Sequence, residues 1–87
     1  MKIVRYRALR QKCRITAIEL ARVVGVSTQR LGQIELLRPG QKPENPERFI
    51  LALETIAAQQ LAACEETLYK CRNMRDRIFD YVDESEV

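Results

Sequence analysis

The sequence predicts an all-α fold, in which an N-terminal bundle of short helices is followed by a long C-terminal helix. Apolar residues recur at helical spacing, and no alternation of apolar and polar residues indicates strands. All Gly and Pro residues lie in the first 46 positions, so nothing local ends a helix in the C-terminal half. With 87 residues, 46% of them hydrophobic, we expect one small soluble unit without a membrane span or signal peptide.

The first three helices are marked by the residues at their ends. A segment without Gly or Pro, about 4–12, forms the first, and Thr16 caps the second with Glu19 completing a capping box. Gly25 ends the second helix, and Ser27 caps the third. The buried residues expected in the second helix are Ile18, Leu20, Ala21, Val23 and Val24. Those expected in the third are Leu31, Ile34 and Leu37, before a loop over residues 38–45.

The long C-terminal helix is expected to run from Pro46 to about Val82, roughly 55 Å at about 1.5 Å per residue. Asn45 is its predicted cap, Pro46 fits the first helical position and Glu47 suits the first turn. Apolar residues along it repeat at alternating steps of four and three, the pattern of a coiled-coil seam. This seam consists of Ala57, Leu61, Cys64, Leu68, Cys71, Arg75, Ile78 and Val82, with Arg75 as its polar interruption.

Charge is divided unevenly along the chain. Residues 1–42 contain ten basic and two acidic residues, a net charge of +8, whereas residues 43–87 contain five basic and ten acidic residues, a net charge of −5. The two halves add to the net charge of +3. This asymmetry indicates that the N-terminal half faces a polyanion, and the alternative is a basic solvated surface without a ligand.

Two short helices joined by Gly25, Val26 and Ser27 have the layout of a helix-turn-helix. The stretch resembles the Cro/repressor-type (xenobiotic-response-element-like) helix-turn-helix family in Glu19-Leu20-Ala21, Gly25-Val26-Ser27 and Gln33-Ile34-Glu35. The likeness covers roughly residues 4–58, the expected DNA-binding domain, and leaves 59–87 as a helical extension. Relatives commonly have Gly in the turn before the second helix, where this chain has Arg14, and a Gly shortly after the position of Glu35, where it has Leu36-Leu37.

The resemblance implies a sequence-specific regulator of transcription that binds double-stranded DNA, most simply a repressor. In a helix-turn-helix the second helix of the motif enters the major groove. The residues expected to contact bases are Thr28, Gln29, Arg30 and Gln33, on the face that also carries Gly32. The residues expected to contact phosphates are Arg5, Arg14, Thr16, Ser27 and Arg38, with Arg7 and Lys12 as further cations. Arg10 and Glu35 match a structural salt bridge of relatives, and Gly25 is expected to be structural.

The C-terminal seam predicts a homodimer, because palindromic half-sites require a two-fold axis. Its expected interface residues are Leu61, Cys64, Leu68, Cys71 and Ile78, and the alternative is that the helix folds back on its own domain. We interpret Cys64 and Cys71 as small apolar core residues, with a redox-sensitive crosslink between chains as the alternative.

An enzyme is not expected, because the chain has no His and shows no nucleophile–base set. No cofactor and no metal site are predicted, and three Cys residues favour a reducing cytoplasm over a disulfide framework. A second hypothesis is an interaction protein, antitoxin-like or a mobile-element accessory, whose acidic C-terminal helix binds a protein partner.

Overall fold

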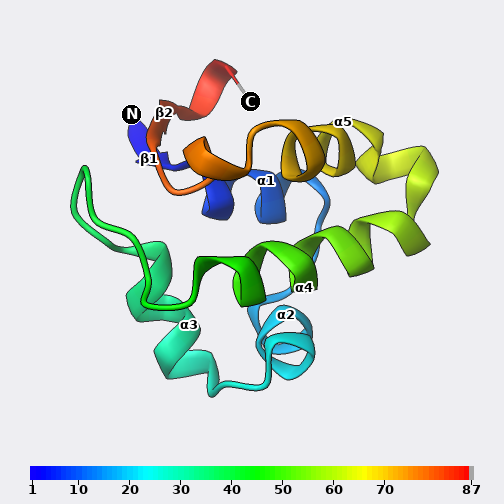
Figure 1. Ribbon diagram of the computed structural model, residues 1–87. Helices are drawn as coiled ribbons and strands as arrows, with labels where there is room; N and C mark the ends of the chain where they lie inside the picture. Colours follow the sequence, from blue (N-terminus) through cyan, green and yellow to red (C-terminus); the bar gives the residue numbers. More distant parts are fainter. Residues whose placement is uncertain (87) are drawn as a thin grey trace.

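The computed structural model describes residues 1–86, without the side chains of residues 61–63 and 86. These residues are mainly helical, with one small two-stranded sheet (Figure 1). In chain order the elements are β1 (Lys2–Val4), α1 (Arg5–Lys12), α2 (Ala17–Val24), α3 (Thr28–Glu35), α4 (Pro46–Gln59), α5 (Leu61–Asn73), the 3-10 turn η1 (Arg75–Arg77), β2 (Tyr81–Asp83) and the 3-10 turn η2 (Glu84–Glu86). In the described part of the chain, none of the helices combines the length and the apolar character that crossing a membrane requires.

The ends of α2 and α3 confirm the predicted caps. The Thr16 hydroxyl accepts a hydrogen bond from the Glu19 backbone N–H at 3.1 Å, and the Ser27 hydroxyl accepts from that of Arg30 at 3.0 Å. Gly25 ends α2 with φ at 89°, a left-handed conformation that costs glycine little, and its N–H donates to the carbonyl of Ala21 at 2.8 Å. Both helices therefore start, and α2 stops, where the local sequence predicts, whereas α3 ends at Glu35 and leaves Leu37, expected in this helix, in the following loop.

The long C-terminal helix is a wrong prediction. The helix that begins at Pro46 ends at Gln59, because Gln60 leaves the helical region (φ −125°, ψ 46°), and α5 then lies beside α4. A further non-helical residue, Cys64 (φ −122°, ψ 17°), bends α5, and the chain leaves α5 at Met74 for η1 and β2. The predicted cap at Asn45 is also absent as a side-chain bond.

Burial explains why the helix breaks without a Gly or Pro. In a straight helix the apolar side chains of Cys64, Leu68, Cys71 and Ile78 would face water, whereas here they are at most 6% exposed. Burying a Leu or Ile side chain stabilises by about 1.5–3 kcal/mol, whereas a lost backbone hydrogen bond costs about 1 kcal/mol net. Several buried side chains therefore outweigh the few helical bonds lost at Gln60.

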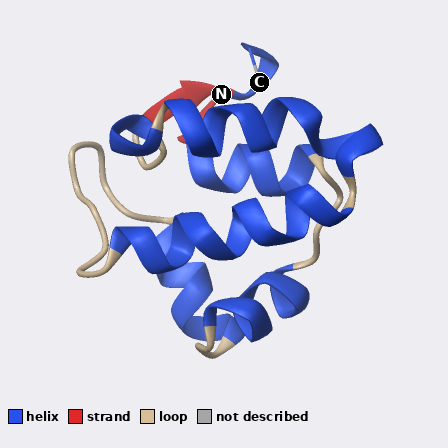
Figure 2. Ribbon diagram, turned by 45° about the vertical axis from the view of Figure 1, so that its right-hand side comes forward, coloured by secondary structure: helices blue, strands red, loops and turns tan. Residues whose placement is uncertain are grey.

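The two ends of the chain form the sheet, which the prediction of an all-α fold does not include (Figure 2). Strands β1 and β2 pair antiparallel, with Ile3 opposite Val82, and the pairing is extended by a bond from the Arg5 N–H to the Asp80 carbonyl at 2.7 Å. Ile3 and Val4 are buried, so β1 also contributes to the core. Three-residue strands are too short to produce a recognisable alternation in the sequence.

One hydrophobic core unites both parts of the chain. Tyr6 lies at its centre, fully buried, with its hydroxyl donating to the Phe49 carbonyl at 2.6 Å and its ring stacked on that of Phe79 at 5.1 Å. Residues before and after position 58 belong to the same cluster, which includes Cys64, Leu68, Cys71, Ile78 and Phe79. The second helix is less buried than expected, since Ile18 is 61% and Val23 46% exposed.

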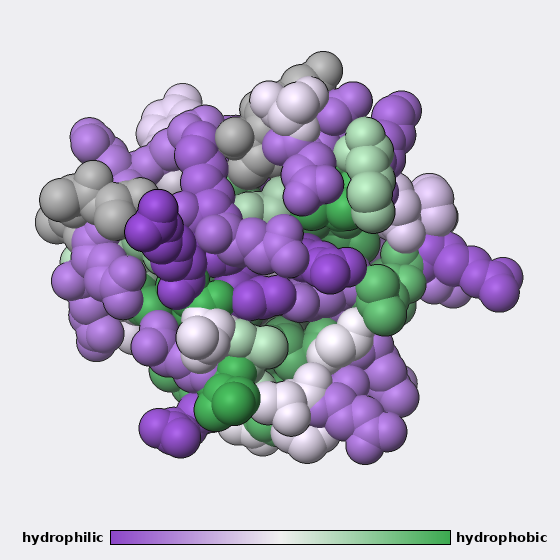
Figure 3. Space-filling model, turned by 180° about the vertical axis from the view of Figure 1, so that it is seen from behind, coloured by the Kyte–Doolittle hydropathy of each residue, from purple (hydrophilic) through white to green (hydrophobic). Residues whose placement is uncertain are grey.

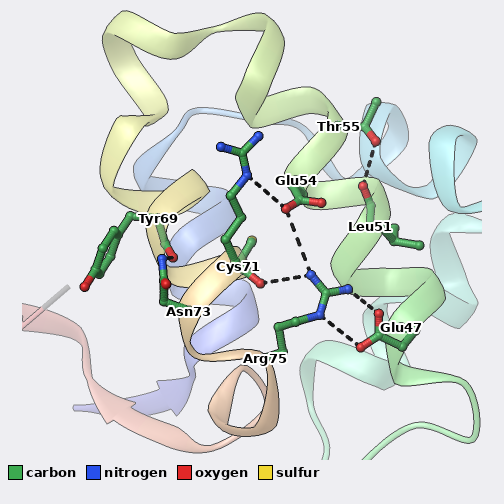
Figure 4. Close-up of polar contacts among 9 residues, drawn as sticks. Glu47, Leu51, Glu54, Thr55, Tyr69, Cys71, Asn73 and Arg75 are labelled. Atoms are coloured by element: carbon green, nitrogen blue, oxygen red, sulfur yellow. Dashed lines mark hydrogen bonds and ion pairs between the residues drawn. The ribbon is translucent and has the colours of Figure 1, made fainter.

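Ion pairs on the surface tie α4 to the end of α5 and to η1 (Figure 4). The Arg75 guanidinium donates to both carboxylate oxygens of Glu47, one of them at 3.1 Å, and Arg72 donates to Glu54 at 3.3 Å. The hydrogen bond from Arg75 holds the pKa of the Glu47 carboxyl below its usual value. Water and salt screen exposed pairs of this kind, so the core rather than the ion pairs stabilises the packing of α5 on α4.

Candidate nucleic-acid interface

The two helices α2 and α3 and the turn between them carry most of the residues predicted to bind DNA. They lie together on the side of the molecule opposite the sheet (Figure 1). Within α3, Leu31 and Ile34 are at most 2% exposed and anchor the helix on the core. The opposite face of α3 is therefore the one directed away from the protein.

All four residues predicted to contact bases are exposed on α3: Thr28, Gln29, Arg30 and Gln33. The Arg30 guanidinium donates to the Gln33 side-chain oxygen at 3.4 Å, the one side-chain contact between two of them in the described structure. Gly32 lies between them in the chain, and a Cβ built on it meets no atom within 4 Å. The outward face of α3 thus combines long polar side chains with an unobstructed stretch of backbone.

The ion pair predicted between Arg10 and Glu35 is confirmed. The Arg10 Nε lies 2.6 Å and the Nη2 3.0 Å from the two carboxylate oxygens, a bidentate arrangement. The side chains are 12% and 6% exposed, and the Arg10 Nη1 also donates to the Ile15 carbonyl at 2.9 Å. The pair therefore fixes α1 and the segment leading into α2 against the last residue of α3.

The structure separates the predicted phosphate contacts into two groups. Thr16 and Ser27 lie at the N-termini of α2 and α3, and Arg14 and Arg38 are exposed in the loops next to these helices. Arg5 lies instead beside the sheet, where its Nη1 donates to the Arg77 carbonyl at 2.8 Å. The Arg5 guanidinium therefore already has a partner within the protein.

Arg14 has a conformation that the sequence did not indicate. Its φ is +57°, in the left-handed region, which costs a residue with a side chain roughly 1–2 kcal/mol. It occupies the turn between α1 and α2, directly before Ile15 and the cap of α2. A glycine would adopt this backbone without strain, so an arginine at this position is unfavourable for the fold alone.

Sequence reasoning missed Arg48, in the first turn of α4. Its Nε donates to the Val24 carbonyl at 2.7 Å and its Nη2 to the Gly25 carbonyl at 3.2 Å. A guanidinium at the C-terminus of a helix satisfies free carbonyls and complements the helix dipole. The Arg48 Nη2 also lies 2.7 Å from the position that a Cβ on Gly25 would occupy, so a larger residue at position 25 would displace this guanidinium. No local pattern indicates a contact between residues 24 positions apart.

The residues predicted as a dimer seam lie inside the single chain. Cys64, Leu68, Cys71 and Ile78 belong to the core, which supports the alternative that this segment folds back on its own domain. The fifth, Leu61, lies outside the described side chains. A helix that used these four residues to pair with a second copy would have to leave its own core.

The cysteines are free thiols, and all three are buried. The Cys13 thiol lies 3.0 Å from the hydroxyl oxygen of Thr67, linking α1 to α5. Burial raises the pKa of the Cys71 thiol to about 12, and burial together with the neighbouring Cys13 raises that of Cys64 to about 12. Among the residues that the structure describes, no group of three or more Cys, Asp or Glu side chains is arranged to hold a metal ion.

The molecular surface is mainly hydrophilic on the side opposite the view of Figure 1. There hydrophobic side chains appear as small separate patches between polar ones (Figure 3).

Comparisons of the chain with models of protein families, with curated proteins and with solved structures give no match.

Proposed function

We propose that this protein binds double-stranded DNA sequence-specifically through α3 and regulates transcription, most simply as a repressor that occupies a promoter. The observation that carries the proposal is the outward face of α3, where exposed polar side chains flank Gly32 on a helix held by the Arg10–Glu35 pair. A helix presented in this way fits the major groove. The resemblance to the Cro/repressor-type family supports the same reading.

Gln29 and Gln33 are one helical turn apart, and each could pair bidentately with adenine. Arg30 would read guanine or hold a phosphate, and Thr28 would contact a base from the start of the helix. The Gln33→Ala substitution is expected to cost about 1–3 kcal/mol on the preferred site and less elsewhere. An equal loss of affinity on all sequences would exclude Gln33 from base recognition.

Phosphate contacts would come from Thr16 and Ser27 at the helix N-termini and from Arg14 and Arg38. The left-handed backbone of Arg14 ends α1, because it lets the Arg14 N–H donate to the Gln11 carbonyl at 3.0 Å and the Ile15 N–H donate to the Arg10 carbonyl at 3.2 Å. What supports a phosphate contact is the exposed cation of Arg14 beside the N-terminus of α2. Arg5, whose guanidinium already binds the Arg77 carbonyl, is the weakest member of the predicted set.

The proposal includes a homodimer on a palindromic operator, and it puts the protein in the cytoplasm, where free thiols stay reduced. Since Cys64, Leu68, Cys71 and Ile78 are buried in the chain, a dimer would have to use another surface.

The experiment that tests the proposal is the selection of bound duplexes from a random DNA pool at near-physiological salt. Enrichment of a palindrome with half-sites about one helical turn apart is the expected result and would identify the operator. Enrichment of a single half-site would retain sequence recognition and remove the dimer. Absence of any enriched sequence would refute sequence-specific DNA binding.

A second candidate function is binding of a protein partner by α5. It is favoured by Tyr69, which is 63% exposed beside a surface hollow of about 330 Å³ lined by Glu65, Leu68, Tyr69, Arg72 and Asn73. Truncation of the chain after Gln60 would not test this idea, because it would remove core residues. The Tyr69→Ala substitution is the suitable test: it should leave duplex binding unchanged while reducing recovery of a co-purifying protein. Unchanged recovery would exclude Tyr69 from such an interface.

A further inference from the structure

One peptide group just beyond the recognition helix is bound on both sides by side chains. It joins Leu37 to Arg38, two residues after the end of α3. The hydroxyl of Tyr81, in β2, donates to the Leu37 carbonyl at 2.6 Å. The N–H of the same peptide group, which belongs to Arg38, donates to the Gln41 side-chain oxygen at 3.0 Å. These two bonds together fix the orientation of the plane from which the Arg38 side chain departs.

The loop that contains this peptide has few other constraints of its own. It has no helix or strand between α3 and α4, and Gly40 adopts a left-handed φ of +85°. A backbone bond from Gln41 N–H to the Arg38 carbonyl, 3.0 Å long, closes the turn at its tip. The Leu37 N–H donates to the Ile34 carbonyl of α3 at 3.4 Å and Pro43 is buried. Between these two points, contacts with the C-terminal segment fix where the loop lies relative to α3.

The C-terminal segment is itself firmly attached to the core. Ile78 and Phe79 are at most 2% exposed, and β2 pairs with β1. The same segment reaches the loop a second time, through a bond of 3.1 Å from the Lys42 Nζ to the Asp76 carbonyl. Leu37 and Tyr81 both pack against the core as partly buried side chains. The segment is thus a rigid support to which the loop is tied at two points.

We infer that Tyr81 is a positioning residue for DNA binding: its hydroxyl holds the Leu37–Arg38 peptide so that Arg38 meets a phosphate at the end of the recognition helix. The inference rests on the proposed function. It gives the C-terminal segment a part in DNA binding although none of its residues needs to touch DNA. Without the hydroxyl, the half-buried Leu37 carbonyl loses its partner and the loop gains freedom to move towards water.

The test compares Tyr81→Phe, which removes one oxygen atom, with Tyr69→Phe, the same change at an exposed tyrosine on α5. Affinity for the selected duplex is measured at 50 and 200 mM salt. One phosphate contact contributes about −0.9 to the slope of log K against log salt, a factor of about 3.5 across this range. Reduced folding stability alone would change the active fraction but not this slope. Arg38→Ala and the double variant Arg38→Ala/Tyr81→Phe complete a thermodynamic cycle.

We expect Arg38→Ala to reduce the salt-dependent drop in affinity about 3.5-fold and Tyr81→Phe to reproduce most of that change. The double variant should be no different from Arg38→Ala, and Tyr69→Phe should behave as the wild type. An unchanged slope in Tyr81→Phe, an unchanged slope in Arg38→Ala, or additive effects in the double variant would overturn the inference while leaving the proposed function intact. A wild-type chain that binds no duplex would overturn the proposed function itself.

Discussion

Replacing Gly32 by alanine separates the stability of α3 from its use in recognition. Gly32 is the fifth of eight residues in this helix, and a Cβ added there meets nothing within 4 Å. Inside a helix, glycine is less favourable than alanine by about 0.8–1.0 kcal/mol, and no steric cost offsets the gain here. We therefore expect Gly32→Ala to raise the free energy of unfolding by about 1 kcal/mol, which corresponds to about 4–8 °C in Tm for a domain of this size.

Thermal and urea unfolding followed by circular dichroism measure this change. Gly40→Ala is the matched control, because it also adds a methyl group to open space but at a φ of +85°. That conformation costs roughly 1–2 kcal/mol with a side chain, so Gly40→Ala should lower the stability. A loss of stability in Gly32→Ala would refute the assignment of an open, regular helix at this position. If α3 lies in the groove, the same substitution should weaken duplex binding despite the more stable fold.

Three further predictions follow from the strained turn, the buried ion pair and the buried thiols. Arg14→Gly should raise the free energy of unfolding in urea by up to about 1 kcal/mol, because it removes the left-handed strain. The same variant should reduce the slope of log K for DNA against log salt by about one. Arg14→Asn, which tolerates that backbone, should show the same reduced slope without losing stability. Glu35→Ala should cost about 3–5 kcal/mol in the same measurement, because it leaves the guanidinium of Arg10 without its buried carboxylate, and a loss below about 1 kcal/mol would show that the pair is not effectively buried. The free energy of unfolding should fall as the pH rises from about 9 to about 12, because the unfolded chain releases its thiol protons near pH 9 whereas burial raises the pKa of Cys71 to about 12 in the fold. Cys71→Ala should make this decline shallower. An unchanged pH profile in Cys71→Ala would contradict the raised pKa of this thiol.

The local sequence determined the framework of the N-terminal half. Thr16, Ser27 and Gly25 act on groups within four positions of themselves, so their roles as caps and helix end could be predicted without knowledge of the fold. The exposed face of α3 follows in the same way from helical periodicity around Leu31 and Ile34. The pairing of Arg10 with Glu35 came from the family resemblance, and the structure confirms it.

Only the tertiary structure decided the course of the C-terminal half. The spacing of Cys64, Leu68, Cys71 and Ile78 gives an apolar face but does not say what covers it, and a second copy and the chain's own core are equally compatible with that spacing. The break at Gln60 has no local signal, because the burial gained by the following residues, rather than any residue at the turn, stabilises it.

The contacts that hold the proposed interface in place could likewise not be predicted from the sequence. Arg48 binds carbonyls at the end of α2 across 24 positions, and Tyr81 binds the Leu37 carbonyl across 44. Every residue has a backbone carbonyl, so the acceptor of such a bond can be any residue type. The pattern of residue types therefore does not indicate which carbonyl is bound. Caps and periodicity act over one or two helical turns and can be read from the chain, whereas these bonds exist only once packing has brought distant segments together.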